Sequence, residues 1–282
     1  FIEGGVEVVS CFEGNKVISR GTILLCIFFG GWFLLQQVNW LGIFKINPLI
    51  RNEYVKKIEV KLGEMMFKDF TSRNSVVDDS LAVATIDSMV TKICDANNID
   101  RKELKVYLLD SEEVNAFALP NHQLMIYTGL VKKTSSPEAL CGVIGHELAH
   151  IEKDHVMQSL VRELGIGTLF AIISGRSDLS MITEVGRIVS SSAFNRNMEK
   201  EADLVGLTYI QNAKIDPKPF AEFIGVIDDK NTPPSAFKWV STHPFPEDRK
   251  EYLLQNIQKE KREYKPVLSA DTWKNFQEFL KD

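Results

Sequence analysis

The sequence lacks most of what marks a disulfide-stabilised, redox-active or nucleic-acid-binding protein. It has four cysteines in 282 residues, Cys11, Cys26, Cys94 and Cys141, and no two form a CxxC pair. That argues against a cysteine zinc site and against a thioredoxin-type redox motif. The formal net charge is -5 and the pI about 5.7, so no global basic field points to nucleic acid, and no nucleic-acid partner is expected.

The chain is equally short of the signs of disorder, since it shows no internal repeat and no low-complexity segment. Hydrophobic residues make up 44% and charged residues 25%, which is ordinary for a folded protein. A chain of 282 residues can bury a substantial core in one large domain or two small ones.

One long hydrophobic run stands out, from residue 21 to residue 44, without a charge between Thr22 and Leu35. A helix of about 20 apolar residues crosses a bilayer, and Trp32 and Trp40 suit an interface. We therefore expect one transmembrane helix at 21–44, and the alternative is a buried or surface-lying hydrophobic helix. The N-terminal fragment 1–20 reads as a possible hairpin, and residues 45–282 as the main domain.

The charges that flank this run bear on its orientation. Upstream lie Lys16 and Arg20, and downstream lie Lys45, Arg51, Lys56, Lys57 and Lys61. Taken literally, the positive-inside rule places the main domain in the cytoplasm.

Hydrophobic periodicity predicts an α+β domain that is mostly helical, with a small mixed sheet. Helices are expected at 53–70 and 78–97, and strands at 105–109, 115–119 and 123–128, the last two as an antiparallel pair. Ser136 followed by Pro137 is a good helix start. Beyond it we expect a short core helix at 164–174, helical structure over 180–212, a helix beginning at Asp216-Pro217 and a loop at 231–235.

The helix that begins at Ser136 carries the segment HELAH, from His146 to His150. On a helix, residues i and i+4 lie on one face, so the two imidazoles can bind one tetrahedral zinc ion. Glu147 points to an adjacent side, where it could take a proton from a metal-bound water. The alternative is a solvated helix face, but much of this helix is apolar, and buried polar groups need partners.

A catalytic zinc site needs a third protein ligand and an open fourth position. Glu199 and Asp203 are four residues apart and share a helix face, whereas Glu201 points about 200° away from Glu199. Spacing alone does not choose between Glu199 and Glu201. His155 lies about 140° beyond His150 on a continuous helix, so we interpret it as structural.

These motifs together resemble the HtpX/BepA-like family of membrane-associated zinc metalloendopeptidases, of the gluzincin type. The matching pieces are HExxH with His155 five residues on, E-x-x-A-D from Glu199 to Asp203, NAFALP at 115–120, TGL at 128–130, and STHP followed by Arg249. They span roughly residues 50–255. The sequence departs from the family at PNHQ, where relatives often have two glycines after the proline.

The resemblance implies one Zn²⁺ per chain, held by His146, His150 and Glu199. Asp203 would then accept a hydrogen bond from a ligand imidazole, and Glu201 would be an outward or supporting residue. Arg249 could position the loop that carries His243 through a carboxylate, and the alternative is a surface arginine.

The strand predicted at 115–119 could bind substrate at its edge, and the alternative is that it is simply a strand of a small sheet. A polypeptide would add as an extra strand to the edge formed by Asn115, Ala116, Phe117 and Ala118. By the resemblance, His243 would lie at the mouth of the site, where it either donates to the oxyanion of the tetrahedral intermediate or occupies the open zinc position as a latch.

The expected function is that of a membrane-anchored zinc endopeptidase that hydrolyses misfolded or misassembled proteins, with Glu147 as the base. The resemblance favours a single-pass protein of the bacterial inner membrane with a periplasmic peptidase domain, against the literal charge count. Two alternatives stay open: a zinc-stabilised, chaperone-like assembly factor with little proteolysis, and a prenyl-protein processing enzyme. The lipid bilayer is an expected partner, and no oligomeric state is predicted.

Overall fold

The computed structural model divides the chain into two compact units, residues 1–52 and residues 53–282. The structure describes residues 53–175, 185, 188, 194–227, 239, 243, 249–257 and 263–281, all in the second unit. The predicted fragment 1–20 and the predicted transmembrane helix 21–44 lie outside the described residues and stay predictions.

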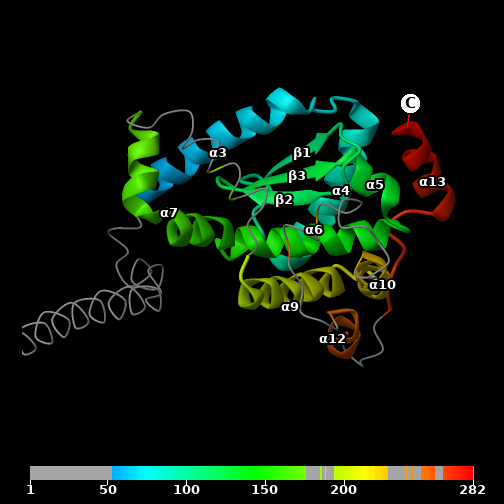
Figure 1. The fold of residues 1–282 in the computed structure, drawn as a ribbon. Coiled ribbons are helices and arrows are strands. Elements are labelled where there is room, and N and C mark those ends of the chain that lie inside the picture. Colours follow the sequence, from blue (N-terminus) through cyan, green and yellow to red (C-terminus); the bar gives the residue numbers. More distant parts are fainter. Residues whose placement is uncertain are drawn as a thin grey trace, which may run out of the picture. The chain divides into compact units, whose positions relative to one another are not determined.

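The described part is mostly helical with one small mixed sheet, as predicted (Figure 1). Its elements are α3 (Glu53–Arg73), α4 (Ser80–Asn97), β1 (Lys105–Leu109), β2 (Ala116–Leu119), β3 (Gln123–Tyr127), α5 (Thr128–Lys133), α6 (Pro137–Glu152), α7 (His155–Ile173), α9 (Arg196–Asn212), α10 (Lys218–Ile227), α12 (Arg249–Asn256) and α13 (Ala270–Phe279). The predicted strand 123–128 ends one residue early, because Thr128 begins α5, a helix that the sequence did not predict.

The three strands lie in the order β1-β3-β2. β2 and β3 are antiparallel, with Ala116 opposite Ile126, so the predicted pair is confirmed. β1 runs parallel to β3, with Lys105 opposite Gln123. β2 is therefore an edge strand of the sheet.

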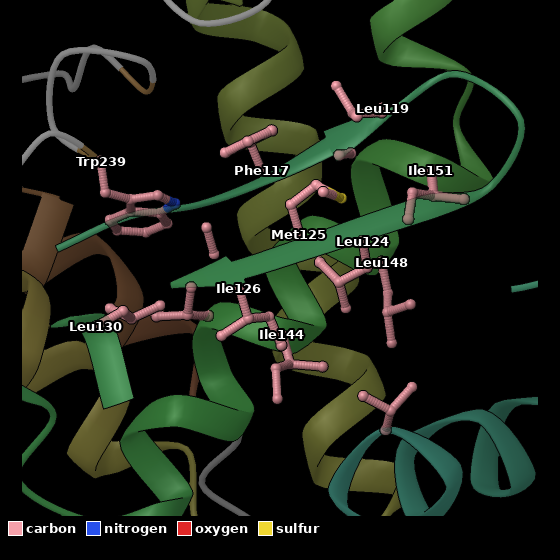
Figure 2. Close-up of a cluster of buried hydrophobic side chains, with 14 of the residues drawn as sticks. Phe117, Leu119, Leu124, Met125, Ile126, Leu130, Ile144, Leu148, Ile151 and Trp239 are labelled. Carbon is pink, nitrogen blue, oxygen red and sulfur yellow. The ribbon is translucent and has the colours of Figure 1, made fainter. Parts of the chain in front are cut away.

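One face of the sheet packs on α6. In Figure 2, Leu124 and Ile126 of β3 point toward Ile144 and Leu148 of α6, and all four are buried. Alternate side chains point to the other face, where Phe117 of β2 meets Phe70 of α3 with ring centroids 4.6 Å apart. The sheet thus holds α6 along its whole length from one side.

The other side of α6 packs tightly against α9, and two small residues make this possible. A Cβ on Gly206 would lie 2.8 Å from the backbone nitrogen of His146, and one on Gly145 would lie 3.0 Å from Cγ2 of Ile210. The backbones can approach this closely only because neither glycine has a side chain. This contact brings the HELAH segment of α6 to the acidic face of α9.

The helix after α6 differs from its prediction. The chain turns at Asp154, whose φ is 55°, and α7 then bends at Gly165, with φ 76° and ψ 150°. The predicted core helix 164–174 is the second half of α7, and it is only partly buried, since Ile166 is 38% and Phe170 50% exposed. Within the described ranges α7 is the one helix long and apolar enough to cross a membrane, judged by length and composition only.

Other predicted segments are seen in part. The helical region predicted at 180–212 appears as α9 from Arg196 onward, and the helix predicted at Asp216-Pro217 begins at Lys218. The predicted loop 231–235 lies outside the described residues.

Candidate metal centre

Helix α6 carries the HELAH residues into the interior of the protein. Ser136 caps the helix, its hydroxyl accepting from the Ala139 amide at 3.2 Å, and Pro137 is the first helical residue, as predicted. His146, Glu147 and His150 have no solvent exposure at all. The alternative of a solvated helix face is therefore wrong, because the sheet and α9 cover both sides of α6.

Four buried side chains converge at this point: His146, His150, Glu199 and His243, with one donor atom of each lying within 4.8 Å of the others. Nε2 of His146 lies 3.0 Å from Nε2 of His150 and 3.2 Å from Nδ1 of His243. Glu199 lies 3.1 Å from His243 Nδ1, 3.3 Å from His150 Nε2 and 3.5 Å from His146 Nε2. In a tetrahedral zinc site with bonds of about 2.0–2.1 Å, neighbouring ligand atoms are about 3.3 Å apart, so the group fits a metal ion.

Hydrogen bonds to the far nitrogens of the two imidazoles show which atoms face the centre. Nδ1 of His146 lies 2.9 Å from Oδ1 of Asp203, and a carboxylate requires an N–H there. That contact leaves Nε2 of His146 with a lone pair in its neutral form, directed at the other three side chains. Asp203 therefore stands in the place predicted for it.

His150 has a support of its own that the sequence reasoning missed. Its Nδ1 lies 3.0 Å from Nδ1 of His155, and Nε2 of His155 lies 3.5 Å from Glu201. The helical-wheel argument for His155 assumed one continuous helix, but α6 ends at Glu152 and the turn brings His155 back beside His150. Its structural interpretation stands, with the specific task of orienting a candidate ligand.

The structure separates the two glutamates that spacing left open. Glu199 is buried among the histidines, whereas the Glu201 side chain is 48% exposed and also pairs with Lys153 at 3.1 Å. Phe194, another residue not anticipated, stacks on the His150 ring with centroids 4.0 Å apart. It closes the centre on the side of α9.

Charges around the centre favour a cation in it. Burial alone would lower the pKa of His146, but the hydrogen bonds and charges of Asp203 and Glu199 outweigh it and raise the pKa to about 9. Burial holds the pKa of His150 well below 6.5, against the pull of Glu199, so this imidazole is neutral. The carboxylates that hold a second proton on His146 would equally hold a metal ion in its place.

The side chain of Glu199 is ionised in the folded protein. Burial opposes its ionisation, but the neighbouring His243, His146 and His150 hold the pKa of Glu199 well below its usual range. Its Oε2 atom is buried and has no hydrogen-bond partner within the described residues. Two histidines and one carboxylate with an unused oxygen form a donor set that suits zinc.

Arg249 of α12 is buried beside this centre and is only 1% exposed. Its Nε donates to Oδ2 of Asp203 at 2.7 Å, and its Nη2 reaches Oδ1 of the same carboxylate. Burial would raise the pKa of Asp203, but Arg249 and His146 outweigh it and lower the pKa. Arg249 therefore acts on the site through Asp203, in addition to contacting Trp239 with its guanidinium 5.3 Å from the ring centroid.

Glu147 meets a partner that sequence reasoning did not include. The indole Nε1 of Trp239 donates to Oε1 of Glu147 at 2.8 Å, and Nε2 of His243 lies 3.3 Å from the same oxygen. The His243 amide donates to the Trp239 carbonyl at 3.0 Å, so a main-chain hydrogen bond joins the two residues. The available signal was spacing, because Trp239 lies four residues before His243 and shares its face.

β2, where substrate was predicted to bind, lies at the edge of the sheet among the described strands, and Trp239 contacts the chain just before it. Asn115, Ala116, Phe117 and Ala118 are all buried, and the side chain of Phe117 is committed to the core. Beside Asn115, the carbonyl of Val114 accepts from the Trp239 amide at 3.2 Å. Figure 2 shows the Trp239 ring close to the start of β2. Main-chain groups of this strand, and not the Phe117 ring, are what it could offer to a peptide.

Comparison with known proteins agrees with the geometry. The family model described as "Peptidase family M48" matches residues 80–257, which include every residue of the centre. The chain belongs to peptidase family M48. The resemblance read from the motifs is confirmed, and so, at the level of the family, is the expected enzyme class, a metalloendopeptidase hydrolase. Members of the M48 family depend on a metal, in keeping with the buried group of three histidines and one glutamate.

Named relatives of this M48 chain come from mitochondria and from bacteria. It is 29% identical over 163 residues to the mitochondrial metalloendopeptidase OMA1 of Bos taurus, covering 52% of this chain and 31% of that protein. It is 23% identical over 208 residues to the beta-barrel assembly-enhancing protease of Escherichia coli K12, covering 68% and 42%. It is 25% identical over 213 residues to the mitochondrial metalloendopeptidase OMA1 of Arabidopsis thaliana, covering 73% and 43%. The chain thus spans less than half the length of these relatives.

Proposed function

We propose that this M48 chain is a zinc-dependent endopeptidase of the gluzincin type, with His146, His150 and Glu199 as the protein ligands of one zinc ion. The observation that carries the proposal is the convergence of four buried side chains, with the cited contacts between their nitrogen and oxygen atoms 3.0 to 3.5 Å long. Beside them, Glu147 holds a carboxylate oxygen without a hydrogen-bond partner among the described residues. A structural zinc site has no use for such a base.

When bound, zinc would act as a Lewis acid that lowers the pKa of water and polarises the scissile carbonyl. The other tasks belong to the chain. Glu147 takes the proton of the attacking water on its carboxylate and passes it to the departing amine. Asp203 and His155 keep the two imidazoles in one orientation, and Arg249 keeps Asp203 ionised.

Peptide substrate, we propose, adds to the β2 edge at Asn115, Ala116, Phe117 and Ala118 through main-chain hydrogen bonds. Supporting this, β2 pairs with β3 alone among the described strands, and Trp239, which donates its amide to the Val114 carbonyl just before β2, also donates its indole N–H to Glu147. The misfolded or misassembled proteins expected as substrates suit this mode, since main-chain pairing is open to any extended segment. The name of the E. coli relative, a beta-barrel assembly-enhancing protease, is in keeping with such substrates.

The position of His243 favours the latch over the oxyanion role. Its Nδ1 lies 3.1 Å from Glu199 and 3.2 Å from His146, where a fourth ligand would be, and Trp239, whose carbonyl accepts from the His243 amide, donates to Glu147. On this proposal residues 239 and 243 hold the site closed. His243→Ala should then raise cleavage, whereas a fall in cleavage with zinc still bound would support the oxyanion role.

We further propose that the chain is a single-pass membrane protein, held by the predicted helix at 21–44 with the peptidase domain at 45–282. The support is the length of that uncharged run. The bacterial inner membrane and a periplasmic domain are the expected setting, and labelling of an added cysteine in the 260–282 tail on sealed vesicles would test the side.

The decisive experiment measures zinc content and casein cleavage for the wild type and for Glu147→Gln. Equal zinc in both proteins with cleavage by the wild type alone would establish the peptidase and its base. Zinc in both with no cleavage even after His243→Ala would support the chaperone-like assembly factor instead. Absence of zinc from folded protein that has not met a chelator would overturn the metal site.

A further inference from the structure

The second half of α7 is a helix without a polar side. From Leu164 to Ile173 the sequence has no charged residue. Leu169 and Ile172 are buried against the domain, which is the ordinary apolar stripe of a surface helix. The stripe next to it holds Ile166, Phe170 and Ile173 at spacing i, i+4 and i+7, of which Ile166 and Phe170 are exposed and Ile173 is partly buried. The solvent-facing side of a surface helix is normally polar, so exposed apolar side chains here require another explanation.

This exposed stripe lies beside basic residues of α3. Figure 1 shows the second half of α7 standing next to the blue N-terminal end of α3. Between them is an open hollow of about 480 Å³, lined by Lys56, Lys57, Val60, Lys61 and Ile173. The three lysines are exposed. Glu59, which lies between these lysines in the sequence, accepts from the Asn121 amide at 3.0 Å.

A kink at Gly165 divides α7 into two halves. The backbone there has φ 76°, a conformation that favours glycine, and a Cβ at this position would meet no atom within 4 Å. The bend separates the first half of α7, which is mostly buried, from the half that carries Ile166 and Phe170.

From these observations we infer a membrane-docking surface on the peptidase domain, formed by Ile166, Phe170 and Ile173 with Lys56, Lys57 and Lys61, that binds a bilayer containing anionic lipids. Apolar side chains rimmed by lysines are the pattern of a helix lying in the headgroup region. Each lysine near such a surface strengthens binding about fivefold.

Chain connectivity adds a second reason to choose a bilayer. The proposed transmembrane helix ends at residue 44 and α3 begins at Glu53, so eight residues join them, which reach at most about 28 Å. If that helix is inserted, the lysines of α3 cannot leave the neighbourhood of the membrane. The inference thus rests on the proposed anchor, though not on the proposed peptidase activity.

The test uses the full chain in vesicles, with an environment-sensitive fluorophore on Phe170→Cys. Cys11 and Cys26 are replaced by serine, and Cys94 and Cys141 are buried. Leu81→Cys on α4 is the matched control, because Leu81 is an apolar residue that is 61% exposed, far along the chain from the surface. Vesicles are made of phosphatidylcholine alone or with phosphatidylglycerol, with and without nitroxide lipids as quenchers.

We expect a blue shift and nitroxide quenching at residue 170 in the phosphatidylglycerol vesicles, and neither at residue 81. The triple variant K56E/K57E/K61E should weaken the docking equilibrium about 100-fold or more, so that the residue 170 signal returns to that of residue 81. Thermal melting of each labelled protein shows that it is folded.

Four outcomes overturn the inference. Residue 170 could stay in water although the protein floats with the vesicles, in which case the anchor stands and the docking surface fails. Residue 170 could be shielded equally in the triple variant and in phosphatidylcholine alone, which would show that another part of the chain covers the surface. It could also be shielded only at high protein density, which would show that a second copy covers it. A protein that does not float with any vesicle refutes both the anchor and the docking surface, while casein cleavage in the same samples judges the peptidase separately.

Discussion

Replacing Trp239 with Phe tests whether the closed arrangement of the centre is a resting state. The change removes one hydrogen bond, the 2.8 Å contact from the indole Nε1 to Oε1 of Glu147. It keeps an aromatic ring beside His146 and His243, whose centroids lie 5.4 and 5.0 Å from the indole. The carboxylate of Glu147 is then left buried, with only the 3.3 Å approach of His243 Nε2 to that oxygen.

A hydrogen bond to a charged group contributes about 1.5–3 kcal/mol, and a buried carboxylate that loses its donor carries the whole of that loss. The loss falls on the closed arrangement, because in an open one Glu147 is reached by water. If the closed form predominates, the open population and the rate of cleavage should rise about 10- to 100-fold. The rate of cleavage can rise no further once every molecule is in the open arrangement.

The assay is cleavage of casein or of a quenched fluorogenic peptide, with zinc content and melting temperature measured on the same samples. Trp273→Phe of α13 is the matched control, since Trp273 is 4% exposed and its Nε1 has no hydrogen-bond partner within the described residues. It should cost stability and leave cleavage unchanged. A fall in cleavage for Trp239→Phe, with normal zinc and a melting temperature like that of the control, would refute the reasoning and make the indole a part of the active form.

Three further predictions concern how α9 and α12 support the centre. Asp203→Asn should weaken zinc binding about 10- to 100-fold, as measured by metal titration. By removing the carboxylate that buried Arg249 binds, it should also lower the free energy of unfolding by about 3–5 kcal/mol, as measured by denaturant melts. The Asp203 pKa is lowered in the folded protein, so its contribution to stability is complete above the unfolded value of about 3.9 and is lost as the pH falls through the folded value. Melts of metal-free protein should therefore show stability falling below about pH 4, and less steeply in the Asn variant. Gly206→Ala places a Cβ 2.8 Å from the His146 backbone nitrogen. The resulting strain of about 1–3 kcal/mol should outweigh the gain of about 1 kcal/mol in helix propensity and lower the melting temperature. An unchanged melting temperature and zinc content would show that α6 and α9 can separate at no cost.

Features that depend on a few neighbouring residues could be predicted from the sequence alone. The start of α6 follows from a hydroxyl cap and a proline, and the antiparallel pair of β2 and β3 from two apolar runs joined by a short polar loop. The HExxH face follows from the helical repeat, because His146 and His150 are one turn apart. Such features need no knowledge of what lies across the fold, and the structure confirms them.

Tertiary structure decided the features that depend on contacts between distant segments. Glu199 lies in the centre and Glu201 outside it because Gly145 and Gly206 let α6 and α9 meet at one angle, which spacing within α9 does not specify. His155 supports His150 because α6 ends before it. Trp239 reaches Glu147 across 92 residues of sequence, and its four-residue spacing from His243 does not show that the two side chains would meet Glu147. The sequence by itself determined which residues can do the chemistry, whereas packing decided which of them meet. A helical wheel gives the direction of each side chain around one helix axis, but it does not give the distance to a second helix.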